Sequence, residues 1–158
     1  MCRRFNLGLL IIILVIITDQ ITKYLALGLK KGSVSIVDKY LNLIYVENRG
    51  AAFGILQGKK FFLTFVTLIV ILAMSFYLYK GYNKFSLITK IGLSLLIGGA
   101  IGNLLDRIIR NYVIDFISVT FPNGYDFPVF NVADICVVVG TLFIIIAFFK
   151  TKDFEGVL

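Results

Sequence analysis

Residues 7–17 read LGLLIIILVII, eleven consecutive residues that carry no charge. The apolar segment continues through Thr18-Asp19-Gln20 to Ala26, and about 20 helical residues are enough to cross the ~30 Å hydrocarbon core of a bilayer. It follows Arg3-Arg4, as a secretory signal peptide would, but no A-x-A cleavage site follows it. We therefore expect residues 7–26 to form an uncleaved membrane-spanning helix.

Three later segments have the same character. Residues 61–79 contain no charge, residues 87–105 are rich in glycine, and residues 129–149 are apolar except near their start. The 158-residue chain is 59% hydrophobic and 16% charged, with a mean hydropathy of +0.94. A soluble domain of this size would carry more charge. The composition predicts one integral membrane domain, residues 1–158, with four spans.

The chain contains no histidine. This excludes Ser-His-Asp and Cys-His catalysis, histidine-ligated zinc sites and H-E-x-x-H proteases. Its two cysteines, Cys2 and Cys136, have no partner at metal-ligand spacing, and we expect both to be inert packing residues.

The net charge is +7, and the basic residues lie in loops that flank the apolar segments. Contact with anionic lipid headgroups explains this distribution better than binding to nucleic acid. Four spans place both termini on one side of the membrane, where seven basic residues lie against nine on the other side. The positive-inside rule therefore leaves the orientation open.

The connection between the first two spans is too long for a simple turn. Residues 33–46 mix β-branched and aromatic residues in partial alternation, for example Leu41, Leu43 and Tyr45. This pattern predicts a short β-hairpin or curved sheet that rests on the membrane.

Asp19 and Lys23 lie four residues apart near the end of the first span. On a helix they share one face, so they can pair and lower the cost of burying either charge. The pair either anchors the helix at the interface or supports a nearby polar site.

Residues 48–54 read NRGAAFG, just before the second span. Small residues and glycine permit close backbone approach, so the segment could receive an extended peptide or a lipid, with Asn48 as a polar anchor. A plain loop that enters the membrane is the alternative.

The third span contains Gly98-x-x-x-Gly102, a pattern that lets helices pack closely in lipid. A polar stripe of Asn103, Asp106 and Arg107 follows at the helix end. Asp106 can pair with Arg107 or with Arg110, and a carboxylate with such partners favours its ionised form, as expected of a structural acid.

Of the three candidate acids, Asp115 and Asp134 lack such partners in the sequence. We expect the residues between them to be loop-like, with turns at Pro122-Asn123-Gly124 and Pro128, and therefore expect both acids at the same membrane face. Two facing carboxyls share a proton, so one remains a proton donor near neutrality. Two separate interfacial acids are the alternative.

Taken together, the motifs resemble those of the lipoprotein signal peptidases, the type II signal peptidases of bacterial membranes. The resemblance covers nearly the whole chain and has five parts in a fixed order. They are Asp19-Gln20-x-x-Lys23, Asn48-x-Gly50-Ala51-Ala52-Phe53, Gly98-Gly99-x-x-Gly102-Asn103-x-x-Asp106-Arg107, Val113-x-Asp115-Phe116 and Phe130-Asn131-x-Ala133-Asp134. Arg49 falls at a variable place in the second motif.

The resemblance implies an aspartic endopeptidase with Asp115 and Asp134 as the catalytic pair. It assigns supporting positions around the site to Asp19, Lys23, Asn48, Gly50, Asn103, Asp106, Arg107 and Asn131. It implies a mostly helical membrane fold of four spans, with a small extracytoplasmic β region near residues 33–56 and a short interfacial helix.

The implied substrate is a bacterial prolipoprotein whose cysteine already carries diacylglycerol, and the chain is cut just before that cysteine. Both termini are then cytoplasmic and the active site lies near the outer face of the cell membrane. The resemblance calls for no metal or other cofactor and no nucleic acid, and one monomer in contact with membrane lipid is sufficient.

Two rival functions remain at this point. A small transporter or channel would also use intramembrane acids, but it favours inverted repeats and polar groups at mid-membrane, whereas these motifs lie at the ends of the spans. A membrane scaffold would explain Gly98-x-x-x-Gly102 but not the clustered acids and asparagines.

Overall fold

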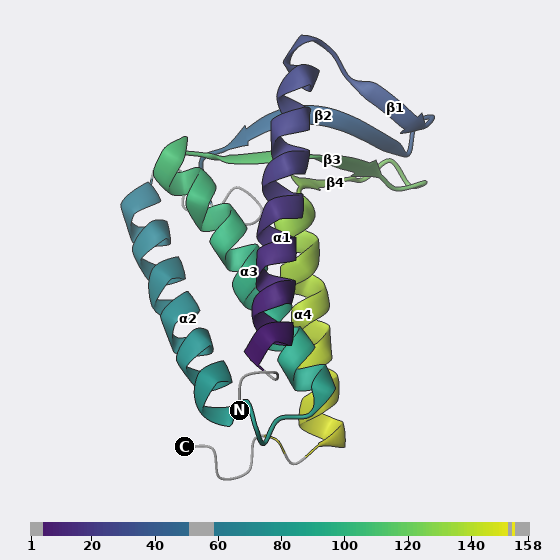
Figure 1. Ribbon diagram of the computed structural model, residues 1–158. Coiled ribbons are helices and arrows are strands. Elements are labelled where there is room, and N and C mark those ends of the chain that lie inside the picture. Colours follow the sequence, from purple (N-terminus) through teal and green to yellow (C-terminus); the bar gives the residue numbers. More distant parts are fainter. Residues whose placement is uncertain (1–4, 51–58, 152, 154–158) are drawn as a thin grey trace.

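The structure is a computed structural model, and it describes residues 5–50, 59–151 and 153. A helical bundle forms one end of the molecule and an antiparallel sheet covers the other (Figure 1). The helices are α1 (Phe5–Ala26), α2 (Lys60–Gly81), α3 (Leu87–Ile109) and α4 (Val132–Lys150). All four are long and apolar enough to cross a membrane, which confirms the four predicted spans.

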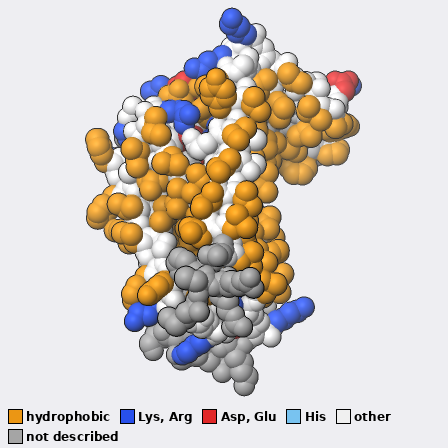
Figure 2. Space-filling view, in the orientation of Figure 1, with side chains coloured by type: hydrophobic (Ala, Val, Ile, Leu, Met, Phe, Trp, Pro, Cys, Tyr) orange, Lys and Arg blue, Asp and Glu red, His pale blue; other side chains and the backbone are white. Residues whose placement is uncertain are grey.

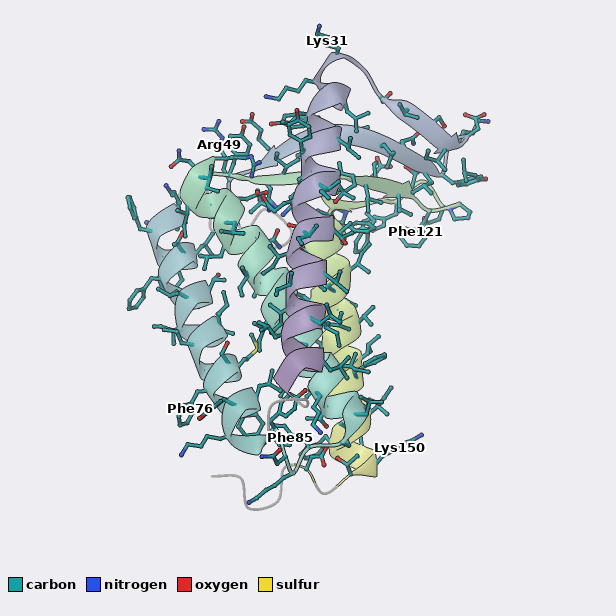
Figure 3. The ribbon with its side chains drawn as sticks, in the orientation of Figure 1. Lys31, Arg49, Phe76, Phe85, Phe121 and Lys150 are labelled. Atoms are coloured by element: carbon teal, nitrogen blue, oxygen red, sulfur yellow. The ribbon has the colours of Figure 1, made fainter. Side chains whose placement is uncertain are left out.

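Hydrophobic side chains cover the middle of the molecule, and lysine and arginine gather at its two ends (Figure 2). Among the large hydrophobic residues that face outward are Phe61, Leu72, Phe76 and Phe149. In water such a surface would drive aggregation, but in a bilayer it is the expected lipid-facing surface. Lys150 at the end of α4 and Phe85 after α2 mark the end opposite the sheet (Figure 3).

Glycine lets α3 pack closely against its neighbours at the centre of the bundle. A Cβ atom added at Gly98 would lie 2.9 Å from Val15 Cβ of α1, and one at Gly99 would lie 2.5 Å from the Ala133 carbonyl oxygen of α4. The predicted role of the Gly98-x-x-x-Gly102 pattern in helix packing therefore holds. Close approach of these backbones draws the polar end of α3 towards α1 and α4.

The sheet has the order β1-β2-β3-β4, and every neighbouring pair is antiparallel. Its strands are β1 (Val34–Val37), β2 (Leu41–Asn48), β3 (Val113–Thr120) and β4 (Asp126–Phe130). A short 3₁₀ helix, η1 (Leu27–Lys31), joins α1 to the sheet. The β1–β2 hairpin agrees with the predicted one, while residues 51–56 of the predicted β region and Ala51–Gly54 of its motif lie outside the described residues.

Two expectations were wrong in detail. The segment between Asp115 and Asp134 is not loop-like, because β3 and β4 form a hairpin there. The fourth span begins at Val132 and not at Val129, since Val129 and Phe130 complete β4 and pair with β3. The reason is that β3 pairs with the distant strand β2, with Val46 opposite Asp115, and this non-local pairing overrides the local turn signals.

Candidate active site

The candidate site lies where the sheet meets the ends of α3 and α1 and the beginning of α4. A pocket of about 700 Å³ opens there. Its lining includes both Asp115 of β3 and Asp134 of α4. Arg49, which also lines it, lies at the sheet end of the molecule in Figure 3. The expectation that the two acids reach the same end of the molecule is therefore met by the fold.

The pocket has a polar and an apolar part. The polar part is formed by Glu47 and Asn48 of β2, Arg49 directly after it, Asn103 and Arg107 of α3, and the two acids. The apolar part is formed by Phe127–Phe130 of β4 and by Ile135 and Val137–Val139 on α4. A cavity with one polar and one apolar part suits an amphiphilic ligand with an aliphatic portion.

Asn131 links the two acids. Its Nδ2 donates to Asp115 Oδ1 at 2.7 Å, and the side chain itself is completely buried. It is also the N-cap of α4: its Oδ1 accepts from the Asp134 backbone N–H at 3.0 Å, and its own N–H donates to Asp134 Oδ2 at 3.1 Å. This reciprocal capping box fixes the orientation of both side chains at the helix start.

The other carboxylate oxygens are held by two more asparagines. Asn48 Nδ2 donates to Asp115 Oδ2 at 2.9 Å, and Asn103 Nδ2 donates to Asp134 Oδ1 at 2.8 Å. The amide oxygen of Asn48 accepts from the Gly50 N–H at 2.9 Å, which fixes which end of the amide faces Asp115. Every carboxylate oxygen of the two acids therefore has an N–H donor.

Behind Asn103 lies a buried ion cluster that contains Asp19, Lys23 and Asp106, each with no exposed surface. Lys23 Nζ lies 2.9 Å from Asp19 Oδ2, 3.2 Å from Asp106 Oδ2 and 2.8 Å from Asn103 Oδ1. Its three N–H donors thus have three acceptors, the arrangement that makes a buried charge tolerable. Of the two readings of the Asp19–Lys23 pair, the one that supports a nearby polar site fits this geometry.

The cluster is tied to the elements that carry the two acids. Asp19 Oδ1 accepts from the Ala133 N–H at 3.0 Å, in the first turn of α4. Asp106 Oδ2 accepts from the Ile114 N–H at 3.0 Å, next to Asp115 on β3. Asp106 pairs with Arg110 at 2.5 Å, whereas Arg107 donates to the Gly50 carbonyl at 3.3 Å. Of the two arginines considered for Asp106, Arg110 is the partner.

The structure thus brings all ten predicted site residues into one connected network. Sequence reasoning gave no role to Gln20, whose Nε2 lies 3.2 Å from Asp19 Oδ2, from the Gly102 carbonyl and from Asp106 Oδ1. Its place beside Asp19 in the first motif was the available signal. The apolar wall from β4 was also missed, because residues 127–130 carry no polar pattern.

Burial is the main influence on Asp115, whose exposed fraction is 2%. It raises the pKa of this carboxyl to about 6, and the negative charge of Asp134 acts in the same direction. Hydrogen bonds from Asn48 and Asn131 oppose the shift without cancelling it. Among the described residues, no group of three or more His, Cys, Asp or Glu is placed to hold a metal ion.

The comparisons with known proteins agree with this architecture. The sequence model of the family described as Signal peptidase (SPase) II matches residues 11–150. The lipoprotein signal peptidase of Clostridium acetobutylicum is 48% identical over 147 residues, which cover 92% of this chain and 94% of that protein. The corresponding protein of Staphylococcus aureus strain JH9 is 40% identical over 154 residues, which cover 95% and 93% of the two chains.

A solved bacterial membrane enzyme, determined at 1.9 Å by the in meso method, superposes with a TM-score of 0.79 and 39% sequence identity. The match covers 90% of this chain and 92% of that one. The four spans and the small sheet therefore belong to a multi-pass bacterial membrane protein. With a family match over residues 11–150 and relatives of 40–48% identity, the chain belongs to the signal peptidase II family of proteases.

Proposed function

We propose that this protein is an aspartic endopeptidase that removes the signal peptide from diacylglyceryl-modified prolipoproteins, with Asp115 and Asp134 as its catalytic residues. The observation that carries the proposal is that both acids lie in the polar part of one pocket whose other part is apolar. The family match supports the substrate class, since relatives are named lipoprotein signal peptidases.

The chemistry follows from two neighbouring carboxyls with one proton between them. One carboxylate takes a proton from water as the water oxygen bonds to the scissile carbonyl carbon. The other, protonated, donates to the carbonyl oxygen as the tetrahedral intermediate forms. The intermediate then collapses and the C–N bond breaks. The amine of the lipidated cysteine takes the proton that the first carboxylate received from water, and the other carboxylate recovers a proton from a hydroxyl group of the intermediate, which becomes the new carboxylic acid. The sequence of steps needs no acyl-enzyme and no metal.

The apolar wall gives the lipid a role in catalysis. Val137–Val139 of α4 and Phe127–Phe130 of β4 offer a surface for acyl chains beside the two acids. A substrate held there by its lipid presents its peptide bond at a fixed depth, which replaces a three-dimensional search by a short intramolecular one. Cleavage before the lipidated cysteine follows if the scissile bond and the diacylglyceryl group occupy adjacent parts of this pocket.

We place both termini in the cytoplasm and the active site near the outer face of the membrane. The beginning of α1 and the end of α4 lie at the end of the bundle opposite the sheet, which is consistent with this orientation (Figure 1). One chain contains the whole polar network, so a monomer suffices for the reaction.

Reconstitution tests the proposal. The purified protein in lipid vesicles should release the signal peptide from a diacylglyceryl-modified prolipoprotein and leave the unmodified precursor intact. Asp115→Asn and Asp134→Asn should each lower the rate by at least ~10³-fold. Asp38→Asn, at an exposed turn of the sheet, is the matched control and should cleave normally. Near-normal cleavage by either active-site variant would refute the assignment.

A further inference from the structure

The surroundings of the two acids differ, although each accepts two N–H groups. Asp134 lies in the first turn of α4, where the helix dipole is positive and the backbone N–H of Asn131 meets Oδ2. A negative charge at this position interacts favourably with the helix dipole. Asp134 is also partly exposed, so its charge keeps some hydration.

The side-chain amide of Asn103 connects the positive charge of Lys23 to Asp134. Lys23 Nζ bonds Asn103 Oδ1 at 2.8 Å, and Asn103 Nδ2 bonds Asp134 Oδ1 at 2.8 Å. The ammonium group polarises the amide, so the N–H groups at its other end become stronger donors to a negative acceptor. The contact with Lys23 also prevents the amide from turning its oxygen towards Asp134, which would repel the ionised carboxylate.

Asp115 lacks the helix dipole and the direct link through Asn103, and the charge of Lys23 favours its ionised form less than burial opposes it. It lies on a strand, where no helix dipole acts, and only 2% of its surface is exposed. Its donors are the neutral side-chain amides of Asn48 and Asn131. Burial penalises the charged form of a carboxyl, and for Asp115 it is the largest influence.

The remaining charged groups around the pair favour the same division. Arg107 interacts more strongly with the charge of Asp134 than with that of Asp115. Glu47 of β2 pairs with Arg49 at 2.9 Å. Asp19 of α1 and Asp106 of α3 are compensated by Lys23. None of these pairs leaves an uncompensated cation beside Asp115.

We infer that Asp115 carries the proton of the pair and donates it to the scissile carbonyl oxygen, whereas Asp134 stays ionised and takes the proton from water. The assignment rests on the proposed function. In this assignment Asn103 and Lys23 position and polarise the base, Asp134, and Asn48 positions the acid, Asp115. The water proton therefore moves to Asp134, and the acid proton leaves from Asp115, so the pair ends the first step with its proton exchanged between the two sites.

Infrared difference spectroscopy tests the assignment without turnover. The protein, Asp115→Asn and Asp134→Asn are compared about one pH unit below the Asp115 pKa of about 6. The carbonyl stretch of a protonated carboxylic acid should disappear in Asp115→Asn and persist, weakened, in Asp134→Asn. Loss of the band only in Asp134→Asn, loss in both variants, or loss in neither would overturn the assignment.

A pair of partly active variants gives a second test. Asn103→Ala removes a donor from the base, so the acidic limb of the pH profile of kcat/KM should move to higher pH. Asn48→Ala removes a donor from the acid, so the alkaline limb should move to higher pH. Shifts of roughly half to one pH unit are expected from the loss of one hydrogen bond to the charged form.

If the roles are reversed, Asn103→Ala shifts the alkaline limb and Asn48→Ala shifts the acidic limb, and that result would overturn the inference. Equal shifts of both limbs in both variants would also overturn it. Failure of the proposed function is recognised separately, because it requires that Asp115→Asn or Asp134→Asn still cleaves the lipidated substrate. The infrared result does not depend on cleavage, so the two failures cannot be confused.

Discussion

Asn131 donates to Asp115 at 2.7 Å while it caps the helix that carries Asp134. One buried amide thus sets the position of both proposed catalytic acids, one on a strand and one on a helix. The relative placement of the acids depends on how β3 and α4 meet, and hence on the bundle that brings them together.

Lys23→Met should destabilise the protein strongly, because Asp19 and Asp106 would remain buried without their shared cation. Breaking a buried ion pair by removing one partner costs ~3–5 kcal/mol. Thermal unfolding in detergent measures the loss. Adding Asp19→Asn should restore part of it, and Lys31→Met, at an exposed position, should have little effect. Equal melting temperatures for Lys23→Met and Lys31→Met would contradict the role of the cluster.

Gly102→Ala should lower both stability and activity. The added Cβ would lie 2.5 Å from Asp19 Oδ2, so α1 and α3 must separate or Asp19 must leave Lys23. Overpacking of this kind costs ~1–3 kcal/mol. Gly28→Ala is the control, since a Cβ there meets nothing within 4 Å. The measurements are the melting temperature and the rate of signal peptide release, and a Gly102→Ala protein as active as Gly28→Ala would refute this packing argument.

The raised pKa of Asp115, about 6 against an ordinary value of 3.8, makes stability depend on pH. The unfolded chain releases this proton at lower pH than the folded protein does, so folding is favoured less as the pH rises from about 4 to about 6. Above that pH range the free energy of unfolding is lower by on the order of 3 kcal/mol, since one pKa unit corresponds to ~1.4 kcal/mol.

Asp115→Asn removes this titration. The stability of the variant relative to the unaltered protein should therefore increase from pH 4 to pH 6 and stay constant above it. Melting temperatures in detergent across this range provide the measurement. A difference that does not change with pH would show that Asp115 titrates normally in the folded protein.

Asp153→Ala should weaken the end of the molecule opposite the site. Asp153 accepts from the Ser86 N–H at 2.8 Å and from Thr89 Oγ1 at 2.5 Å at the start of α3. Burial opposes ionisation there, but these hydrogen bonds outweigh it and hold the pKa of Asp153 below its usual value. The variant should lose ~1–2 kcal/mol at neutral pH.

A depressed pKa means that this contribution is present at neutral pH and is lost as the pH falls below about 4. The difference in melting temperature between Asp153→Ala and the unaltered protein should therefore shrink in acid. Cleavage of the lipidated substrate at neutral pH should be unchanged. A pH-independent difference, or a loss of cleavage below the melting temperature, would contradict this account.

Local sequence signals were sufficient for the helices and insufficient for half of the sheet. Length and hydropathy decide a membrane span, so the four spans were predictable, as was the hairpin of Val34–Val37 and Leu41–Asn48. The strand Val113–Thr120 pairs with residues about 70 positions earlier in the chain, and nothing local reports such a partner. Pro128, which signals a turn in sequence, lies in the edge strand β4, where a missing N–H is tolerated.

The candidate site was predictable in its residues but not in its connections. Polar groups near hydrocarbon are costly, so each one in a predicted span indicates a site or a buried partner. Which oxygen meets which donor depends on the packing of α1, α3 and α4, for example the contact of Asp19 with the Ala133 N–H. Gln20 and the apolar wall of β4 were overlooked because their roles exist only after folding.

The hydrogen bond from Ala133 to Asp19 joins the first span to the last, and it has a consequence for biogenesis. Asn131 and Asp134 lie at the start of α4, after the other three spans, so a nascent chain that ends before α4 contains neither the second proposed acid nor the cap that orients it. With Asp115 and Asp134 as the proposed catalytic pair, we expect a chain with only three inserted spans to have no peptidase activity. We expect activity to arise when the fourth helix enters the membrane and packs against the first.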